Sequence, residues 1–235
     1  MSTIALDKVT WQNCWADVGT YAHKATVENF IQDVVEPGLA SLDRKITEYS
    51  EKGGAWEAFA VPDLKAVRRE TTAAFSLAIQ SIWERQMRGY LHRCAAELHP
   101  QRTELLQRAQ SNKWAEVEAL FLELRGVALT DFPPYGALST LHLLGNAARH
   151  GEGQSVTKLR RQHPEFWPEM PLGDYTPLVH LGQLLITVEH LRHFSEAIGA
   201  FWDEIEIIRL RSLNSKDDRI LRGIEELIRQ RKFVT

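Results

Sequence analysis

The sequence has only two cysteines, Cys14 and Cys94, among its 235 residues. Two cysteines this far apart do not make the dense disulfide framework of small secreted domains. They also cannot supply a cysteine-based structural zinc site, which needs at least two cysteines close together in the sequence. We therefore expect both thiols to be free and buried.

Long apolar runs are also missing from the sequence. No stretch approaches the roughly 20 apolar residues that are needed to span a bilayer. The first residues, Met1 to Lys8, do not combine a basic start with an apolar run, so a signal peptide is not expected. These two absences predict a cytoplasmic protein that has no contact with a membrane.

The chain lacks an excess of positive charge. Lysine and arginine number 28 against 31 aspartate and glutamate residues, which gives a formal net charge of -3. A protein without a global basic field can bind nucleic acid only through a local basic patch. Any binding to RNA must therefore depend on a small cluster of cations.

Familiar catalytic motifs are absent as well. The sequence contains no glycine-rich phosphate loop, no GxSxG elbow and no HExxH helix. His190 and His193, with Glu189, have the spacing of metal ligands, but nothing nearby supplies the remaining ligands of a zinc site. We expect neither a metal nor a cofactor.

What the sequence does contain is long helical periodicity. The three strongest patterns run from Pro62 to Leu98, from Gly136 to His150, and from Thr187 to about Ile208. Proline suits the first position of a helix, and Gly151 suits the position just after the last. Three long amphipathic helices joined by short connections predict an all-α fold, a single helical bundle of about seven to nine helices.

Shorter elements complete this prediction. Pro37-Gly38 interrupts one pattern, either as a kink or as a break between two helices. The residues from 178 to 186 suit a small hairpin around Gly182. The domain prediction is an arm at 1–20, a bundle domain at 21–210, and a helix at 211–235 that docks on the body or on a partner. Further short helices are expected at Thr103–Gln110, at Trp114–Arg125, from a cap at Ser155 to His163, and at Lys216–Arg231.

The most unusual string lies at the end of the Gly136–His150 helix. His142, Asn146 and Arg149 fall on one helix face, with His150 beside them at the helix end. A histidine next to an arginine can serve acid–base chemistry or hold a phosphate. The alternative is structural, because arginine and histidine are common in a last helical turn, where they complement the helix dipole.

Two further groups of cations accompany this string. One lies at i, i+3 and i+7 on the Pro62–Leu98 helix, and the other forms a basic tip on the short helix after Gly153. Each can contact a phosphate, and each can equally be the solvated flank of a helix. With His142, the predicted substrate-binding residues are Arg85, Arg88, His92, Lys158, Arg160 and Arg161.

The string from Asn146 to His150 at a helix end, in an all-helical chain, resembles the HEPN superfamily. The HEPN motif is an arginine followed by a polar residue, often asparagine, and then a histidine after a gap of four to six residues. His150 matches the histidine and Asn146 the polar residue, whereas Gly145 stands where the arginine is usual and Arg149 is the substitute on the same face. Arg85 and His92 fit the loose spacing too.

A second resemblance concerns the segments around Trp83, Asn146–Leu159 and Phe201, about a third of the chain. They are similar to uncharacterised bacterial helical proteins in which a string Asn-Ala-x-(Lys/Arg)-His-Gly-x-Gly recurs.

The HEPN resemblance implies a bacterial defence or toxin-type protein, in particular a metal-independent ribonuclease or an RNA binder. It implies His150 as general base, Arg149 as phosphate clamp and Asn146 as a hydrogen-bonding aid. It also implies a homodimer, for which Trp11, Trp15 and Trp56 are available as interface residues, and a protein partner encoded by a neighbouring gene. The rival hypothesis is a non-enzymatic interaction or scaffold module of a multi-protein complex.

Overall fold

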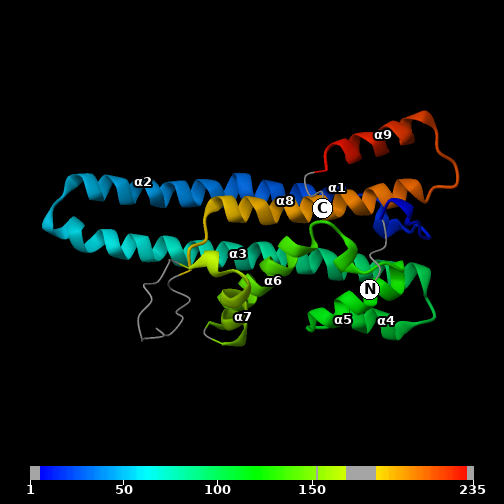
Figure 1. The fold of residues 1–235 in the computed structure, drawn as a ribbon, viewed down its shortest axis with the longest axis horizontal. Coiled ribbons are helices and arrows are strands. Elements are labelled where there is room, and N and C mark those ends of the chain that lie inside the picture. Colours follow the sequence, from blue (N-terminus) through cyan, green and yellow to red (C-terminus); the bar gives the residue numbers. More distant parts are fainter. Residues whose placement is uncertain (1–5, 152, 168–183, 232–235) are drawn as a thin grey trace. The chain divides into compact units, whose positions relative to one another are not determined.

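The computed structural model describes residues 6–151, 153–167 and 184–231. In these ranges the chain forms α-helices, short 3-10 turns and one π-helical turn, and no strand (Figure 1). The all-α prediction is therefore confirmed. The α-helices are α1 (Tyr21–Phe30), α2 (Glu36–Lys52), α3 (Ala55–Leu98), α4 (Thr103–Ala109), α5 (Trp114–Arg125), α6 (Tyr135–His150), α7 (Gln154–Gln162), α8 (Val188–Arg211) and α9 (Asp218–Arg229).

The connections contain five short elements. Four are 3-10 turns and the fifth, η3, is a π-helical turn. They are η1 (Leu6–Lys8), η2 (Trp15–Asp17), η3 (Ile31–Val35), η4 (Leu129–Asp131) and η5 (Pro164–Phe166). Most of the hairpin predicted near 178–186 lies outside the described residues, and residues 184–186 are not in a strand.

One continuous helical stretch runs from α1 into α2 through the π-helical turn η3. Pro37 follows that turn, and a proline inside a helix removes one N–H donor and crowds the preceding turn. A π-helical turn is one of the ways in which a helix absorbs such a disturbance. The interruption predicted at Pro37-Gly38 is thus a local change in helix winding, not a break between two helices.

Helix α3 starts seven residues earlier than the sequence pattern indicates, so the prediction that it begins at Pro62 is wrong. It begins at Ala55 and contains Pro62 in its interior. Ala58, whose carbonyl loses its partner at Pro62, is exposed, so water can replace the missing N–H. The start is set by Gly53, whose left-handed φ of 64° ends α2.

The chain divides into two compact units, each built from segments that are distant in the sequence. Unit 1 comprises Met1–Val27, Ile82–Leu138 and Glu196–Thr235, and unit 2 comprises Glu28–Ser81 and Ser139–Ser195. Helices α1, α3, α6 and α8 therefore contribute residues to both units. The predicted boundaries at residues 20 and 210 stay a prediction.

The core of unit 1 is aromatic. The ring of Phe201 in α8 lies 4.8 Å from those of Trp83 in α3 and Phe132, measured between centroids. Trp202 donates its indole N–H to Gln86 Oε1 at 3.0 Å, so this buried ring is also hydrogen-bonded. The Trp83–Phe201 pair packs edge to face, which adds to the stabilisation from burying large rings and joins α3 to α8 within unit 1.

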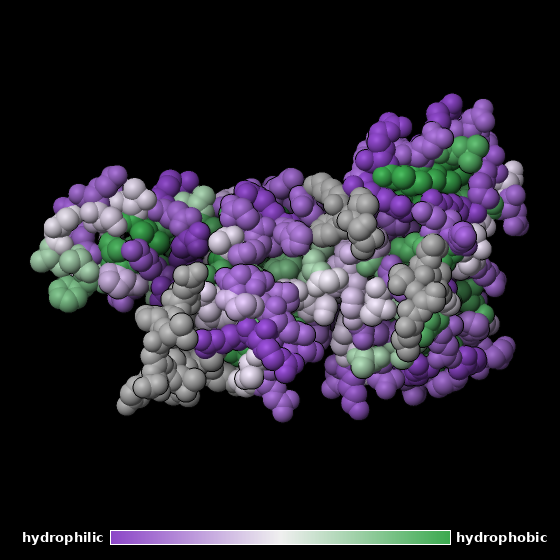
Figure 2. Space-filling view, in the orientation of Figure 1, coloured by the Kyte–Doolittle hydropathy of each residue, from purple (hydrophilic) through white to green (hydrophobic). Residues whose placement is uncertain are grey.

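Helix α9 lies along α8 in unit 1 (Figure 1). Ile224 is buried, and Arg231, just after the helix, donates Nη2 to Glu204 Oε2 at 2.9 Å. Leu221 and Ile228 stay 45% and 36% exposed, and Figure 2 shows apolar side chains along α9 between charged ones. Only part of the apolar face of this strongly amphipathic helix is therefore buried.

The core of unit 2 forms where α2 and α3 run antiparallel after the turn at Gly53 (Figure 1). Gly38 of α2 faces the ring of Phe75 in α3, since a Cβ at this position would lie in ordinary contact with that ring at 3.4 Å. The predicted inward residues of α6 and α8, such as Leu141 and Leu191, are fully buried. Among the described residues, no helix has the length and apolar character to cross a membrane.

Candidate functional site

The predicted site lies at the carboxyl end of α6, in unit 2. The helix ends because Gly151 takes a left-handed φ of 68° and donates its N–H to the carbonyl of Ala147 at 2.9 Å. Arg149 and His150 are both exposed. Among the described residues neither side chain has a hydrogen-bond or ion-pair partner, so both are open to a ligand from solvent.

The side chain of Asn146, unlike those of Arg149 and His150, has a partner among the described residues. Its Nδ2 lies 2.9 Å from Nε2 of His142, one turn earlier on the same helix. The other ring nitrogen of His142, Nδ1, lies 3.4 Å from Nε2 of Gln80 in α3. The structure thus joins His142 and Asn146, as their spacing indicates, but in a half-buried polar chain that runs from α6 to α3.

The same pair of helices explains why residue 145 is a glycine. A Cβ on Gly145 would lie 1.9 Å from Gln80 Oε1 and 2.5 Å from Gln80 Cδ. At Gly145, α6 therefore lies directly against the side chain of Gln80 in α3, which occupies the space that a side chain would need. An arginine cannot stand at this position without displacing Gln80.

Helix α7 carries the predicted basic tip, also in unit 2. Val156 and Leu159 are buried and seat the helix, whereas Lys158 and Arg161 are exposed and Arg160 is half-buried. The N-cap is Gly153, so Ser155, which we expected as the cap, lies inside the helix. Lys158, Arg160 and Arg161 therefore lie in the same unit as Arg149 and His150.

The third predicted group, on α3, belongs to unit 1 instead. Arg88 is occupied: it donates Nη1 to Glu84 at 2.8 Å and Nε to the carbonyl of Ser111 at 3.0 Å. Arg88 therefore ties α3 to the connection between α4 and α5. Arg85 is exposed and His92 is half-buried.

Sequence reasoning missed a hydroxyl–imidazole–carboxylate chain in unit 2. Thr140 Oγ1 lies 2.9 Å from His163 Nε2, and His163 Nδ1 lies 3.0 Å from Glu165 Oε1. This order of groups resembles that of catalytic triads. Thr140, however, is only 8% exposed, so the chain of contacts serves to hold the end of α7 on α6.

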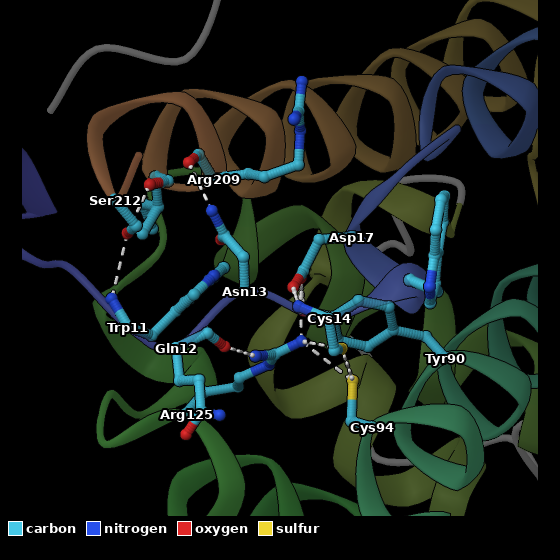
Figure 3. A network of polar contacts seen from close by, with 12 residues as sticks. Trp11, Gln12, Asn13, Cys14, Asp17, Tyr90, Cys94, Arg125, Arg209 and Ser212 are labelled. Atoms are coloured by element: carbon cyan, nitrogen blue, oxygen red, sulfur yellow. Dashed lines mark hydrogen bonds and ion pairs between the residues drawn. The ribbon is translucent and has the colours of Figure 1, made fainter. Parts of the chain in front are cut away.

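A second missed cluster surrounds Arg125, at the end of α5 in unit 1 (Figure 3). The side chains of Arg125 and Asp17 are both fully buried, with Nη2 and Oδ1 2.7 Å apart. Tyr90 donates its hydroxyl to the same Oδ1 at 2.7 Å, and the N–H of Cys14 donates to Oδ2 at 2.8 Å. The carboxylate is thus held by three donors in the absence of solvent.

The guanidinium of Arg125 is also held by aromatic rings. Its Cζ lies 4.7 Å from the ring centroid of Trp11 and 5.0 Å from that of Tyr90. Trp11, predicted as an interface residue, therefore packs inside its own chain. Trp15 and Trp56, the other two predicted interface residues, are 79% and 74% exposed.

The two cysteines lie next to each other in this cluster. The sequence predicts that both thiols are free and buried, but it does not predict that they are neighbours. Their Sγ atoms are 3.8 Å apart, and Arg125 Nη2 lies 2.8 Å from Cys94 Sγ and 3.4 Å from Cys14 Sγ. The hydrogen bond with Cys94, opposed by burial and assisted by Arg125, lowers the pKa of Cys14 to about 7. Burial raises the pKa of Cys94.

No group of three or more metal-ligating side chains occurs among residues 6–151, 153–167 and 184–231. His190 accepts a hydrogen bond from the N–H of Thr187 at 3.1 Å through Nδ1, so this ring caps α8. Comparison with known proteins finds no matching family model, no similar curated protein and no similar solved structure.

Replacing Gly145 by alanine tests the α3–α6 contact. The new Cβ collides with Gln80, so we expect a loss of about 1–3 kcal/mol of unfolding free energy, measured by urea denaturation. Gly136→Ala on the same helix is the matched control, because nothing lies within 4 Å of its Cβ position. Equal stability of the two variants would contradict the close approach.

Replacing Arg125 by methionine tests the buried ion pair. The carboxylate of Asp17 then loses its counter-ion in a dry environment, so we expect a destabilisation of about 3–5 kcal/mol by urea denaturation. The double variant Asp17→Asn/Arg125→Met leaves no buried charge and should recover at least about 1 kcal/mol of this loss. If the double variant is as unstable as the sum of both single variants, the two charges are not coupled.

Proposed function

We propose that this chain is a HEPN-like RNA-binding protein and that the α6–α7 corner of unit 2 holds the RNA phosphates. The corner is defined by Arg149, His150, Lys158 and Arg161. One observation carries the proposal: Arg149 and His150 are exposed cationic or titratable groups without a partner in the described residues, and Lys158 and Arg161 follow on the next helix. A role in a defence or toxin-type system, with a partner from a neighbouring gene, belongs to this proposal.

The distribution of paired and unpaired cations supports this location. Arg68, Arg88 and Arg192 are engaged by carboxylates of their own unit. An arginine that already has a carboxylate partner is a poor phosphate ligand, since binding would have to break that pair. At the α6–α7 corner, a phosphate can bind without breaking an ion pair of the described residues.

The chemistry proposed at this corner is cleavage assisted by His150. RNA carries its own nucleophile, the 2′-hydroxyl, so the reaction needs only a base and a group that stabilises charge on the phosphate. An imidazole can act as the general base that accepts this proton. Arg149, the preceding residue, provides the cation for the non-bridging oxygens.

In this proposal Asn146 has a structural role, because its side chain is engaged within α6. Its amide is bonded to His142, so it stabilises the α6 side of the site but does not orient His150. His150 therefore has to be positioned by the RNA or by a partner. This favours binding over fast cleavage by the chain alone.

The first test of the proposal is the triple substitution Arg149→Ala/Lys158→Ala/Arg161→Ala. We expect the affinity for single-stranded RNA to fall at least about tenfold at moderate salt. The slope of log affinity against log salt should decrease by about 2, because three phosphate contacts at roughly 0.7 each are lost. Fluorescence anisotropy over a salt series measures both quantities.

Arg44→Ala is the matched control, because Arg44 is an exposed arginine on α2 of the same unit. It should leave affinity and salt slope unchanged. His150→Ala, assayed with a chelator present, should abolish cleavage but leave most of the binding. If the triple variant binds RNA as well as the wild type does, the location is wrong; if His150→Ala still cleaves, only the catalytic part fails.

A second function, that of an interaction module, is favoured by exposed aromatic residues at the turn between α2 and α3. Trp56 and Phe59 are 74% and 76% exposed, and Figure 2 shows apolar side chains at this end of the α2–α3 hairpin. Large exposed aromatic residues are typical of protein interfaces. We propose a second copy of the chain as the partner, in keeping with the predicted homodimer.

Light scattering at micromolar concentration tests this second proposal. The wild type should give the mass of a dimer, and Trp56→Ser/Phe59→Ser should give that of a monomer without loss of helix content, because exposed positions contribute little to stability. Leu122→Ser, at an exposed apolar position on α5, is the control and should remain dimeric. A monomeric wild type would refute the proposal.

A further inference from the structure

We propose that Cys14 and Cys94 form a modification site, at which a peroxide oxidises the two thiols to a reversible disulfide. These are the only cysteines of the chain, and they are 80 residues apart in the sequence. The fold of unit 1 nevertheless brings their sulfurs to 3.8 Å. This juxtaposition, within a cluster of charged groups, carries the inference. It does not involve the α6–α7 corner and is independent of the proposed RNA binding.

The geometry requires only a small movement. A disulfide bond is about 2.05 Å long, so the sulfurs have to approach by roughly 1.8 Å. Cys94 lies in the final turns of the long helix α3, whereas Cys14 lies between Trp11 and the 3-10 turn η2. The short N-terminal segment can therefore adjust while α3 stays in place.

The surroundings favour oxidation of Cys14 first. Arg125 Nη2 faces both sulfurs and stabilises a negative charge on either of them (Figure 3). Cys14 is 5% exposed and Cys94 is fully buried, so a small oxidant reaches Cys14 first. The lowered pKa of Cys14 and the raised pKa of Cys94 agree with this order.

The reaction proceeds in two steps with hydrogen peroxide as the oxidant. The Cys14 thiolate attacks one peroxide oxygen, so that an S–O bond forms, the O–O bond breaks, and the leaving hydroxide takes up a proton to become water. The sulfur of Cys94 then attacks Cys14 Sγ, the S–S bond forms and the S–O bond breaks. The proton of Cys94 goes to the second hydroxide, so two thiols and one peroxide give one disulfide and two waters.

The disulfide joins the N-terminal segment covalently to α3. The ion pair between Arg125 and Asp17 is not broken by the reaction, because neither group takes part in it. Reduction by a dithiol restores both thiols. Exposure to peroxide therefore changes the covalent state of the two cysteines in unit 1, while the buried ion pair stays in place.

Intact-mass spectrometry on the wild-type chain tests the proposal without any substitution. The reduced protein is treated with a small excess of hydrogen peroxide, quenched with catalase, and unfolded in N-ethylmaleimide. We expect the mass to fall by two hydrogens, no maleimide adduct, a monomer on a non-reducing gel, and two adducts after dithiothreitol. Two free thiols after an exposure that fully oxidises added glutathione would overturn the proposal, as would disulfide-linked dimers or sulfinic acid as the main product.

Two variants test the order of the steps. Cys94→Ser should accumulate a sulfenic acid on Cys14 that dimedone captures, and Cys14→Ser should leave Cys94 without dimedone. Capture of Cys94 in Cys14→Ser together with no capture in Cys94→Ser would reverse the assignment of the attacking thiol. If either variant fails to fold, the wild-type measurement still decides whether the disulfide forms.

Discussion

A guanidinium group that is shielded from water has to be neutralised and hydrogen-bonded by the protein, and Arg125 imposes this requirement on unit 1. Burying this charge without a partner would destabilise the fold by several kcal/mol, whereas an unpaired arginine on the surface stays hydrated and has no such cost. Its partners come from separate parts of the chain: Asp17 and the carbonyl of Gln12 precede α1, and Cys94 lies near the end of α3. The N-terminal segment, α3 and α5 are therefore ordered together, because each supplies what the others need.

Unit 2 depends on a steric constraint of a different kind. Gly145 of α6 lies against the Gln80 side chain of α3, and a Cβ at this position would collide with it. Gln80 uses the space and reaches His142, which in turn contacts Asn146. The polar residues in the middle of α6 therefore stabilise helix packing, and only the last turn is left for a ligand.

The polar residues of the described chain fall into two groups: those that hold helices together and those that are open to a ligand. Arginines such as Arg88 and Arg125 bind carbonyls and carboxylates of the protein and hold helices together. Arg149 and His150 have no such task among the described residues, and the proposal that RNA binds at the α6–α7 corner rests on this difference. The chain of contacts from Thr140 to Glu165 is also assigned to helix packing, because the hydroxyl of Thr140 is buried.

The sequence by itself determined the helical class, the bounds of α5 and the end of α6 at Gly151, because apolar periodicity and glycine caps are local properties of the backbone. It also indicated the contact between His142 and Asn146, which lie one helical turn apart. It misplaced the start of α3, because proline suits a first helical position, whereas the exposed carbonyl of Ala58 lets water replace the N–H that Pro62 lacks inside the helix. The pairing of Cys14 with Cys94, the burial of Arg125 with Asp17, and the contact of Gln80 with Gly145 were decided only by the tertiary structure, since each joins residues that are far apart in the sequence.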